Sequence, residues 1–149
     1  MSTTDFTMKM LVPVSSQETY ELINDVRGWW ADNFTGKSSS AGDEFEVRFR
    51  DVHYSKQRLT SMEPGKHIEW LVTDSDLTFL DKSNEWTGTK IRFDIAPKNG
   101  QTEISFTHEG LNPGIECYKD CSRGWTYYLQ ESLLPFINNG KGKPGYPEY

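Results

Sequence analysis

The chain has 149 residues, enough for one domain with a sizeable core, and no apolar run approaches the ~20 residues of a membrane-spanning helix. A formal net charge of −6 argues against nucleic-acid binding, because a phosphate backbone is bound by a basic surface. Hydrophobic residues make up only 35% of the chain but aromatic residues 13%, so we expect a core built from few, large side chains.

The N-terminal part of the chain predicts a strand followed by a short helix. Apolar residues alternate over 6–12, and Pro13 ends this strand. Ser15 or Ser16 then caps a helix, with Glu18 placed for a capping box. The helix breaks at 24–28.

Two adjacent tryptophans, Trp29 and Trp30, follow this break. Neighbouring residues of a regular element point in different directions, so we expect one to pack and the other to be exposed at an entrance or an interface. The alternative buries both under the end of the sheet. A polar surface loop is predicted for 35–42 because it is rich in Ser and Gly.

Strands with alternating apolar residues dominate the middle of the chain. They are predicted at 45–49, 54–62, 67–73, 85–96 and 101–109. Leu59 and Met62 do not share a parity, which predicts a β-bulge between them. Residues 74–84 are predicted as a mobile flap or a short edge strand, and 97–100 as a hairpin turn.

The stretch 115–137 predicts one long amphipathic helix. Its apolar stripe recurs at steps of three and four: Cys117, Cys121, Trp125, Tyr128, Leu129, Leu133 and Phe136. The cysteines lie four apart on one helix face, where a disulfide is difficult to form, so we interpret them as two small buried side chains. A metal site would need more ligands than these two. No metal and no cofactor are predicted.

Together these elements predict an α+β fold in which a curved antiparallel β-sheet wraps around the long C-terminal helix, with two short helices after the first strand. A single domain is predicted for 1–149, with 138–149 as an irregular tail. The N-terminal residues lack the pattern of a secretory signal, so a cytoplasmic location is expected.

Six short motifs occur in the order seen in one protein family, at 25–30, 42–45, 63–65, 85–89, 107–111 and 124–125 followed by Leu133. In these motifs the chain resembles proteins similar to the C-terminal domain of the activator of heat-shock-protein-90 ATPase, within the START-type (SRPBCC, helix-grip) superfamily. The resemblance implies a hydrophobic tunnel between sheet and helix. It also implies a chaperone as one class of partner. Fold alone does not settle function in this superfamily, which includes carriers, receptors and cyclases.

Residues predicted to face the concave side of the sheet are the candidates for ligand binding: Trp70, Phe93, Phe106, His108, Trp125 and Tyr128. They could equally fill the core. Trp30 is a further candidate, as one of the two tryptophans of which either could lie at an entrance. His108 is the weak candidate for a catalytic acid or base. Its alternative is a buried, hydrogen-bonded histidine that holds the corner of the strand.

The sequence therefore supports three hypotheses. The first is a module that binds a hydrophobic or aromatic small molecule. The second is a cyclase- or dehydratase-type enzyme that uses His108 with Tyr128, although no catalytic constellation is present, so enzyme activity stays undecided. The third is an interaction protein that docks on a chaperone or forms a homodimer through Trp29 or Trp30.

Overall fold

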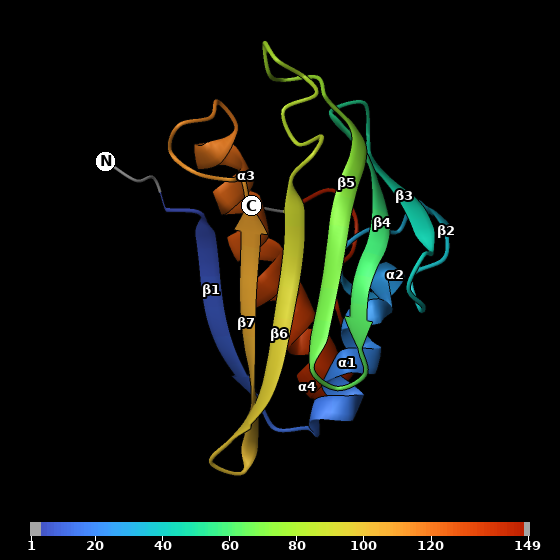
Figure 1. The fold of residues 1–149 in the computed structure, drawn as a ribbon, viewed down its shortest axis with the longest axis vertical. Helices are drawn as coiled ribbons and strands as arrows, with labels where there is room; N and C mark the ends of the chain where they lie inside the picture. Colours follow the sequence, from blue (N-terminus) through green and yellow to red (C-terminus); the bar gives the residue numbers. More distant parts are fainter. Residues whose placement is uncertain (1–3, 148–149) are drawn as a thin grey trace.

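The computed structural model describes residues 4–147, in which a seven-stranded antiparallel sheet curves in front of a long C-terminal helix (Figure 1). The sheet order is β1-β7-β6-β5-β4-β3-β2. The strands are β1 (Phe6–Val12), β2 (Phe34–Gly36), β3 (Glu44–Phe49), β4 (His53–Glu63), β5 (His67–Leu77), β6 (Lys90–Lys98) and β7 (Gln101–Glu109). The predicted α+β, helix-grip fold is confirmed.

Two short helices follow the first strand, as predicted. They are α1 (Ser16–Asn24) and α2 (Val26–Trp29). Ser15 is the N-cap of α1, and its hydroxyl accepts a hydrogen bond from the backbone N–H of Glu18 at 3.1 Å. Both helices lie on the concave side of the sheet beside the end of the long helix (Figure 1).

The long helix is interrupted rather than regular. It consists of α3 (Tyr118–Tyr127), a π-helical segment η1 (Tyr128–Leu133) and α4 (Leu134–Asn139). Pro135 has no N–H to bond the carbonyl of Glu131 in a regular α-helix, and we attribute the wider turns of η1 to this proline. The prediction of one continuous stretch over 115–137 therefore missed the start of the helix, its end and this change of pitch.

The alternating patterns place large apolar side chains on the concave face of the sheet. On β3, β5, β6 and β7 the predicted inward residues are buried, including Phe45, Trp70, Phe93 and Phe106. The bulge predicted near Leu59 is confirmed, since the pairing of β4 with β5 shifts register between Leu59 and Ser61. The alternation of apolar residues along the strands thus identified correctly which face of the sheet packs in the core.

Three predicted boundaries were wrong. The expected loop at 35–42 begins inside a short edge strand, β2, which pairs with β3. Residues 74–77 complete β5 in the middle of the sheet, so the edge-strand interpretation of 74–84 fails. Finally, β6 begins only at Lys90, because 85–89 forms turns that end the β5–β6 loop.

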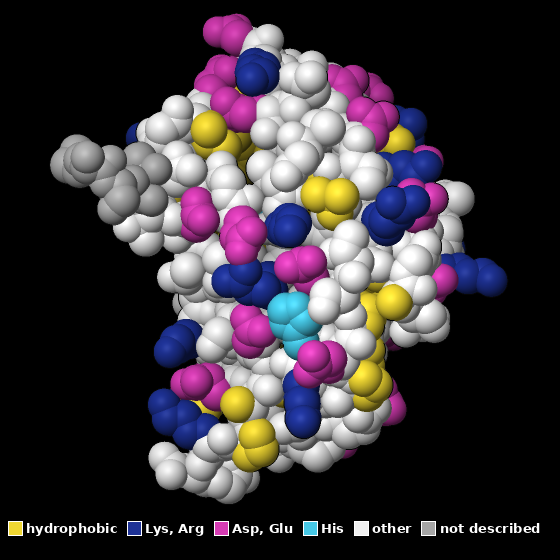
Figure 2. Space-filling view, in the orientation of Figure 1, with side chains coloured by type: hydrophobic (Ala, Val, Ile, Leu, Met, Phe, Trp, Pro, Cys, Tyr) yellow, Lys and Arg dark blue, Asp and Glu magenta, His cyan; other side chains and the backbone are white. Residues whose placement is uncertain are grey.

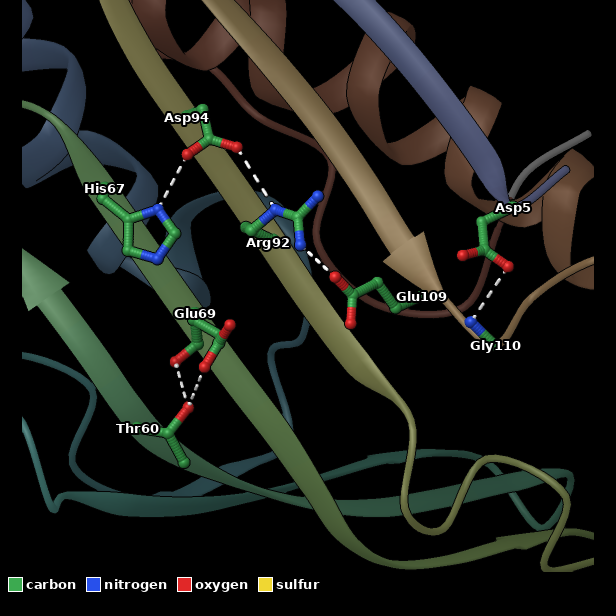
Figure 3. Close-up of polar contacts among 8 residues, drawn as sticks. All are labelled: Asp5, Thr60, His67, Glu69, Arg92, Asp94, Glu109 and Gly110. Atoms are coloured by element: carbon green, nitrogen blue, oxygen red, sulfur yellow. Dashed lines mark hydrogen bonds and ion pairs between the residues drawn. The ribbon is translucent and has the colours of Figure 1, made fainter.

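The outer face of the sheet is polar, with basic and acidic side chains interspersed (Figure 2). A row of contacts crosses three strands, in which Asp94 binds both His67 and Arg92, and Arg92 binds Glu109 (Figure 3). Thr60 donates to the carboxylate of Glu69 on the neighbouring strand at 2.8 Å. Such mixed charge describes a solvated surface.

The irregular segment after α4 lies against the body of the protein. The N–H of Lys143 donates to Ser132 Oγ at 2.6 Å, and that hydroxyl donates to the carbonyl of Trp29 at 2.6 Å. The remaining residues of the predicted tail, 148 and 149, lie outside the described residues, as do 1–3 of the N-terminal segment. Within residues 4–147, no helix combines the length and the apolar composition that a membrane crossing requires.

Candidate functional site

Trp30 lies at the centre of the space between sheet and helix. Its ring stacks on Trp125 of α3 at 5.1 Å and on Trp70 of β5 at 5.7 Å, measured between ring centroids. Trp29 is also buried, and its indole N–H donates to the carbonyl of Ile23 at 2.9 Å. The expectation that one of the two tryptophans is exposed was therefore wrong: α2 ends at Trp29, and the chain turns there, so both rings point inward.

Trp70, Phe93 and Phe106 form a continuous aromatic layer on the sheet. The ring centroids of Trp70 and Phe93 are 5.3 Å apart, and those of Phe93 and Phe106 are 5.1 Å apart, in edge-to-face arrangements. All three side chains are fully buried. They face inward as predicted, but their neighbours are other core residues.

His108 is enclosed by hydrogen bonds on both ring nitrogens. Trp125 Nε1 donates to His108 Nδ1 at 3.0 Å, and Thr89 Oγ1 lies 2.9 Å from Nε2. The Thr89 hydroxyl donates to the carbonyl of Trp86 at 2.6 Å, so His108 Nε2 must carry the hydrogen that Thr89 accepts. Burial, with a smaller contribution from His53, lowers the pKa of His108 to about 3, so the imidazole is neutral. These contacts match the alternative in which His108 is a buried, hydrogen-bonded histidine.

A pocket of about 310 Å³ opens at the end of the sheet where the β3–β4 turn meets the β5–β6 loop. This turn and this loop are at the top of Figure 1. Helix α3 and the C-terminal segment form its other walls. Seven aromatic side chains line it: Trp30, Phe49, Phe79, Trp86, Trp125, Tyr128 and Tyr146. Its titratable lining residues are His53, Asp120, Arg123 and the tyrosines.

The pocket contains three of the seven predicted ligand-binding residues, namely Trp30, Trp125 and Tyr128. The structure brings these together at its inner wall. Trp70, Phe93, Phe106 and His108 do not line it and lie behind this wall in the packed core.

Sequence reasoning missed the pocket residues that come from loops and from the C-terminal segment. Phe79 and Trp86 belong to the β5–β6 loop, and Tyr146 follows the last helix. No periodic pattern marks such positions. His53 did have a signal, because it shares the odd parity of Leu59 on β4 and therefore points inward.

His53 stands in an aromatic surrounding at the pocket wall. Its ring contacts Trp86 at 4.9 Å and Phe49 at 5.0 Å, both edge to face. Burial lowers the pKa of His53 to about 3. His53 Nε2 lies 2.8 Å from Ser55 Oγ. His53 therefore presents a neutral imidazole at the pocket wall.

A reciprocal pair of carboxylates holds the β5–β6 loop against the start of α3. The carboxylate of Glu85 accepts the backbone N–H groups of Glu116 and Cys117, each at 2.9 Å. In return the carboxylate of Glu116 accepts the N–H groups of Asp81 and Lys82, at 3.0 Å and 3.4 Å for the same oxygen. Because Phe79 and Trp86 are on this loop, the contacts position two pocket walls. We call this set of contacts the carboxylate clasp.

Cys117 and Cys121 are joined as a disulfide, so the prediction of two separate thiols was wrong. Cys117 is the N-cap of α3 and not an interior helical residue, and the two Cα atoms are 5.4 Å apart, within disulfide range. Cys121 lines the pocket, and its Sγ accepts a hydrogen bond from Trp86 Nε1 at 3.3 Å. Among residues 4–147, no cluster of three or more His, Cys, Asp or Glu side chains is arranged to hold a metal ion.

The C-terminal segment forms the last wall of the pocket. Tyr128 Oη donates to the carbonyl of Gly145 at 2.6 Å, and the N–H of Gly145 donates to the carbonyl of Trp30 at 2.9 Å. These contacts place Tyr146 at the opening, where the Arg50 guanidinium lies 3.9 Å from its ring centroid.

Comparison with solved structures shows the same fold in several bacterial proteins. The solution structure of the Aha1 dimer from Colwellia psychrerythraea has a TM-score of 0.76 and 20% identity, covering 93% of this chain and 99% of that one. A Staphylococcus saprophyticus protein has a TM-score of 0.70 and 16% identity, covering 94% and 96%. A Bacillus halodurans protein has a TM-score of 0.70 and 14% identity, covering 93% and 100%.

At these identities the structural likeness shows the fold alone, and none of the curated proteins matches the sequence. The family described as "Activator of Hsp90 ATPase homolog 1-like protein" matches residues 23–134, which include helix α2, the strands β2 to β7 and most of the long helix. The chain therefore belongs to the family of activator of Hsp90 ATPase homolog 1-like proteins.

Proposed function

We propose that the protein binds a small apolar or aromatic molecule in the pocket between the sheet and the C-terminal helix. The observation that carries this proposal is the seven-ring lining of a space of about 310 Å³. Small-molecule sites usually enclose about 300–1,000 Å³ and combine aromatic walls with a few polar groups. The pocket is at the small end of this range, which favours a compact ligand of about two fused rings.

The polar groups of the pocket support a neutral ligand more than a strongly charged one. His53 is neutral at physiological pH, while Asp120 and Arg123 contribute opposite charges near the opening. A ligand therefore gains binding free energy mainly from ring packing, and the His53 imidazole supplies a directional contact.

The test is an NMR titration of the indole N–H signals with 2-naphthol, a two-ring probe. We expect saturable shifts at Trp86 and Trp125, which line the pocket, together with a single dissociation constant. If none of a series of apolar and aromatic probes shifts these signals saturably, the proposal is wrong.

A matched pair of variants locates the binding. Phe79 and Leu11 are apolar and equally exposed, at 47% and 48%, but only Phe79 lines the pocket. Phe79→Ser should weaken 2-naphthol binding about threefold or more, since it removes one packed ring. Leu11→Ser should leave binding unchanged. Equal effects of both variants would place the probe elsewhere.

A second candidate function is association with an Hsp90-type chaperone. The family description and a similar structure, the Aha1 dimer, support this candidate. The dimer also raises the question of whether this chain associates with itself. The test is the ATPase rate of a purified Hsp90 with increasing amounts of this protein, together with sedimentation of each alone. An unchanged rate and a monomeric sedimentation profile would contradict this candidate without affecting the pocket.

Catalysis by His108 gains no support from its position. Both of its ring nitrogens are hydrogen-bonded and its side chain is fully buried. We propose that His108 instead holds Trp125 in place through the 3.0 Å contact, which shapes the inner wall of the pocket.

A further inference from the structure

The inner face of β4 carries polar side chains where the paired positions of β3 carry apolar ones. His53, Ser55 and Gln57 follow at alternate positions, and the last two are fully buried. Gln57 Nε2 donates to Ser55 Oγ at 2.6 Å, and the same hydroxyl lies 2.8 Å from His53 Nε2. Because His53 lines the pocket, this polar row runs from the pocket wall into the interior.

Two buried polar atoms, one on β4 and one on the neighbouring β5, have no hydrogen-bond partner within residues 4–147. They are Gln57 Oε1, which is an acceptor, and Trp70 Nε1, which is a donor. Both side chains are 0% exposed. Buried polar atoms are rarely left unpaired, because desolvation without a partner is costly. Apolar side chains could fill these positions without that cost.

The strand register makes the two residues neighbours. Gln57 pairs with Val72 and Leu59 pairs with Trp70, so Gln57 and Trp70 are diagonal on the inner face of β4 and β5. The register also shifts between Lys56 and Gln57, and such bulges re-aim the side chain beside them. A group that accepts from an indole N–H and donates to an amide oxygen is a hydroxyl.

We propose that Gln57 and Trp70 form a subsite for one hydroxyl oxygen, which accepts from Trp70 Nε1 and donates to Gln57 Oε1. A buried water can supply this hydroxyl, and so can an aromatic alcohol that enters from the pocket. The second source rests on the proposed function. It also requires Trp30 to turn aside, because Trp30 lines the pocket and stacks on Trp70 at 5.7 Å.

The experiment follows the indole N–H signal of Trp70, assigned by its absence in Trp70→Phe. For the water source, we expect a water–indole cross-peak at this signal in the ligand-free protein, lost in Gln57→Leu. For the alcohol source, 2-naphthol should bind about three- to tenfold more tightly than 2-methylnaphthalene, and this preference should disappear in Gln57→Leu.

A control variant separates the subsite from the pocket wall. His53→Phe keeps an aromatic ring in the lining but removes the imidazole, so a preference held by Gln57 and Trp70 survives in it. If the preference for 2-naphthol is lost in His53→Phe but kept in Gln57→Leu, His53 binds the hydroxyl. Together with the absence of a water cross-peak, that result overturns the proposal. The comparison of 2-naphthol with 2-methylnaphthalene on the wild-type protein needs no variant to fold.

Failure of the subsite and failure of the proposed function give different results. If neither naphthalene probe binds, the proposed function fails, and the water cross-peak alone then decides the subsite. A cross-peak supports it with water as the source. If there is no cross-peak and no preference for 2-naphthol, the proposal is overturned, whether or not the pocket binds both probes.

Discussion

The space between sheet and helix is filled by ring packing at its centre and closed by polar contacts at its mouth. At the centre, Trp30 is 2% exposed and stacks on rings from β5 and α3. At the mouth, Phe79 and Tyr146 are 47% and 43% exposed, and the carboxylate clasp holds the loop that carries Phe79. The difference teaches that buried ring packing is concentrated at the centre, whereas the exposed aromatic walls of the pocket lie at the mouth.

The largest effect should come from Trp30→Ala, which breaks the packed centre. Removing a fully buried ring typically costs about 3–5 kcal/mol in the free energy of unfolding. Urea unfolding measures this loss. The new cavity would join the pocket, so a protein that still folds should bind larger aromatic probes than the wild type.

Tyr146→Ala is the matched change at the mouth. Because this ring is 43% exposed, its removal should alter the free energy of unfolding by no more than about 1 kcal/mol, while weakening probe binding. Equal losses of stability in the two variants would contradict the division into a packed centre and a mouth held by polar contacts.

This division also separates what the sequence could predict from what it could not. Alternation along β7 placed Thr102, Ile104, Phe106 and His108 on one face, and all four are buried. Strand periodicity reports such positions because every second residue faces the core. The sequence could therefore predict the centre of the molecule.

Strand periodicity could not predict the mouth of the pocket. Trp86 becomes a pocket wall only because the Glu85 carboxylate binds the backbone N–H of Glu116, while the Glu116 carboxylate binds that of Asp81, which is far away in the sequence. Tyr146 reaches the opening because Gly145 bonds to Trp30 and Tyr128. Such contacts leave no periodic trace. The proline at 135 could have signalled the irregular helix, since it removes a backbone donor.

The second largest effect is a loss of stability in mild acid. The pKa values of His108 and His53 are lowered to about 3 by burial, whereas an unfolded histidine titrates near 6.5. Between these values the unfolded chain binds more protons, so stability is present above pH 6.5 and falls as the pH decreases toward 3. Each histidine should contribute up to about 1.4 kcal/mol per pH unit, measured by urea unfolding at pH 7.5, 6.5 and 5.5.

One of these histidines belongs to the centre and one to the mouth, which allows their contributions to be separated. His53→Phe should lower the pH slope by about half, because only His108 then remains neutral in the fold. An unchanged slope would show that His53 accepts a proton at the pocket without unfolding the protein.

A smaller effect is expected from Glu85→Ala, which removes one side of the carboxylate clasp. Losing the acceptor for the N–H groups of Glu116 and Cys117 should cost about 1–2 kcal/mol, as for a helix cap. Binding of 2-naphthol should weaken as well, because the loop positions Phe79 and Trp86. Glu131→Ala, an exposed position on the same long helix, should stay within about 0.5 kcal/mol of the wild type. If both variants keep full probe binding, the clasp does not position the pocket walls.

The smallest effect should come from Glu109→Gln on the outer face of the sheet. Glu109 binds Arg92, which also binds Asp94 (Figure 3). The three side chains keep between 30% and 49% of their surface in solvent. Exposed ion pairs contribute about 0–1 kcal/mol, and salt screens them. The difference from wild type in urea unfolding should therefore be below about 1 kcal/mol and should shrink in 0.5 M salt, where the Debye length is about 4 Å. The Glu85 carboxylate of the clasp bonds backbone N–H groups at the start of α3, so its contribution should lose little to the same salt. Glu109→Gln could instead lower the free energy of unfolding as much as Glu85→Ala does, with as little response to salt. Polar contacts on the outer face would then stabilise the protein as much as those that close the pocket.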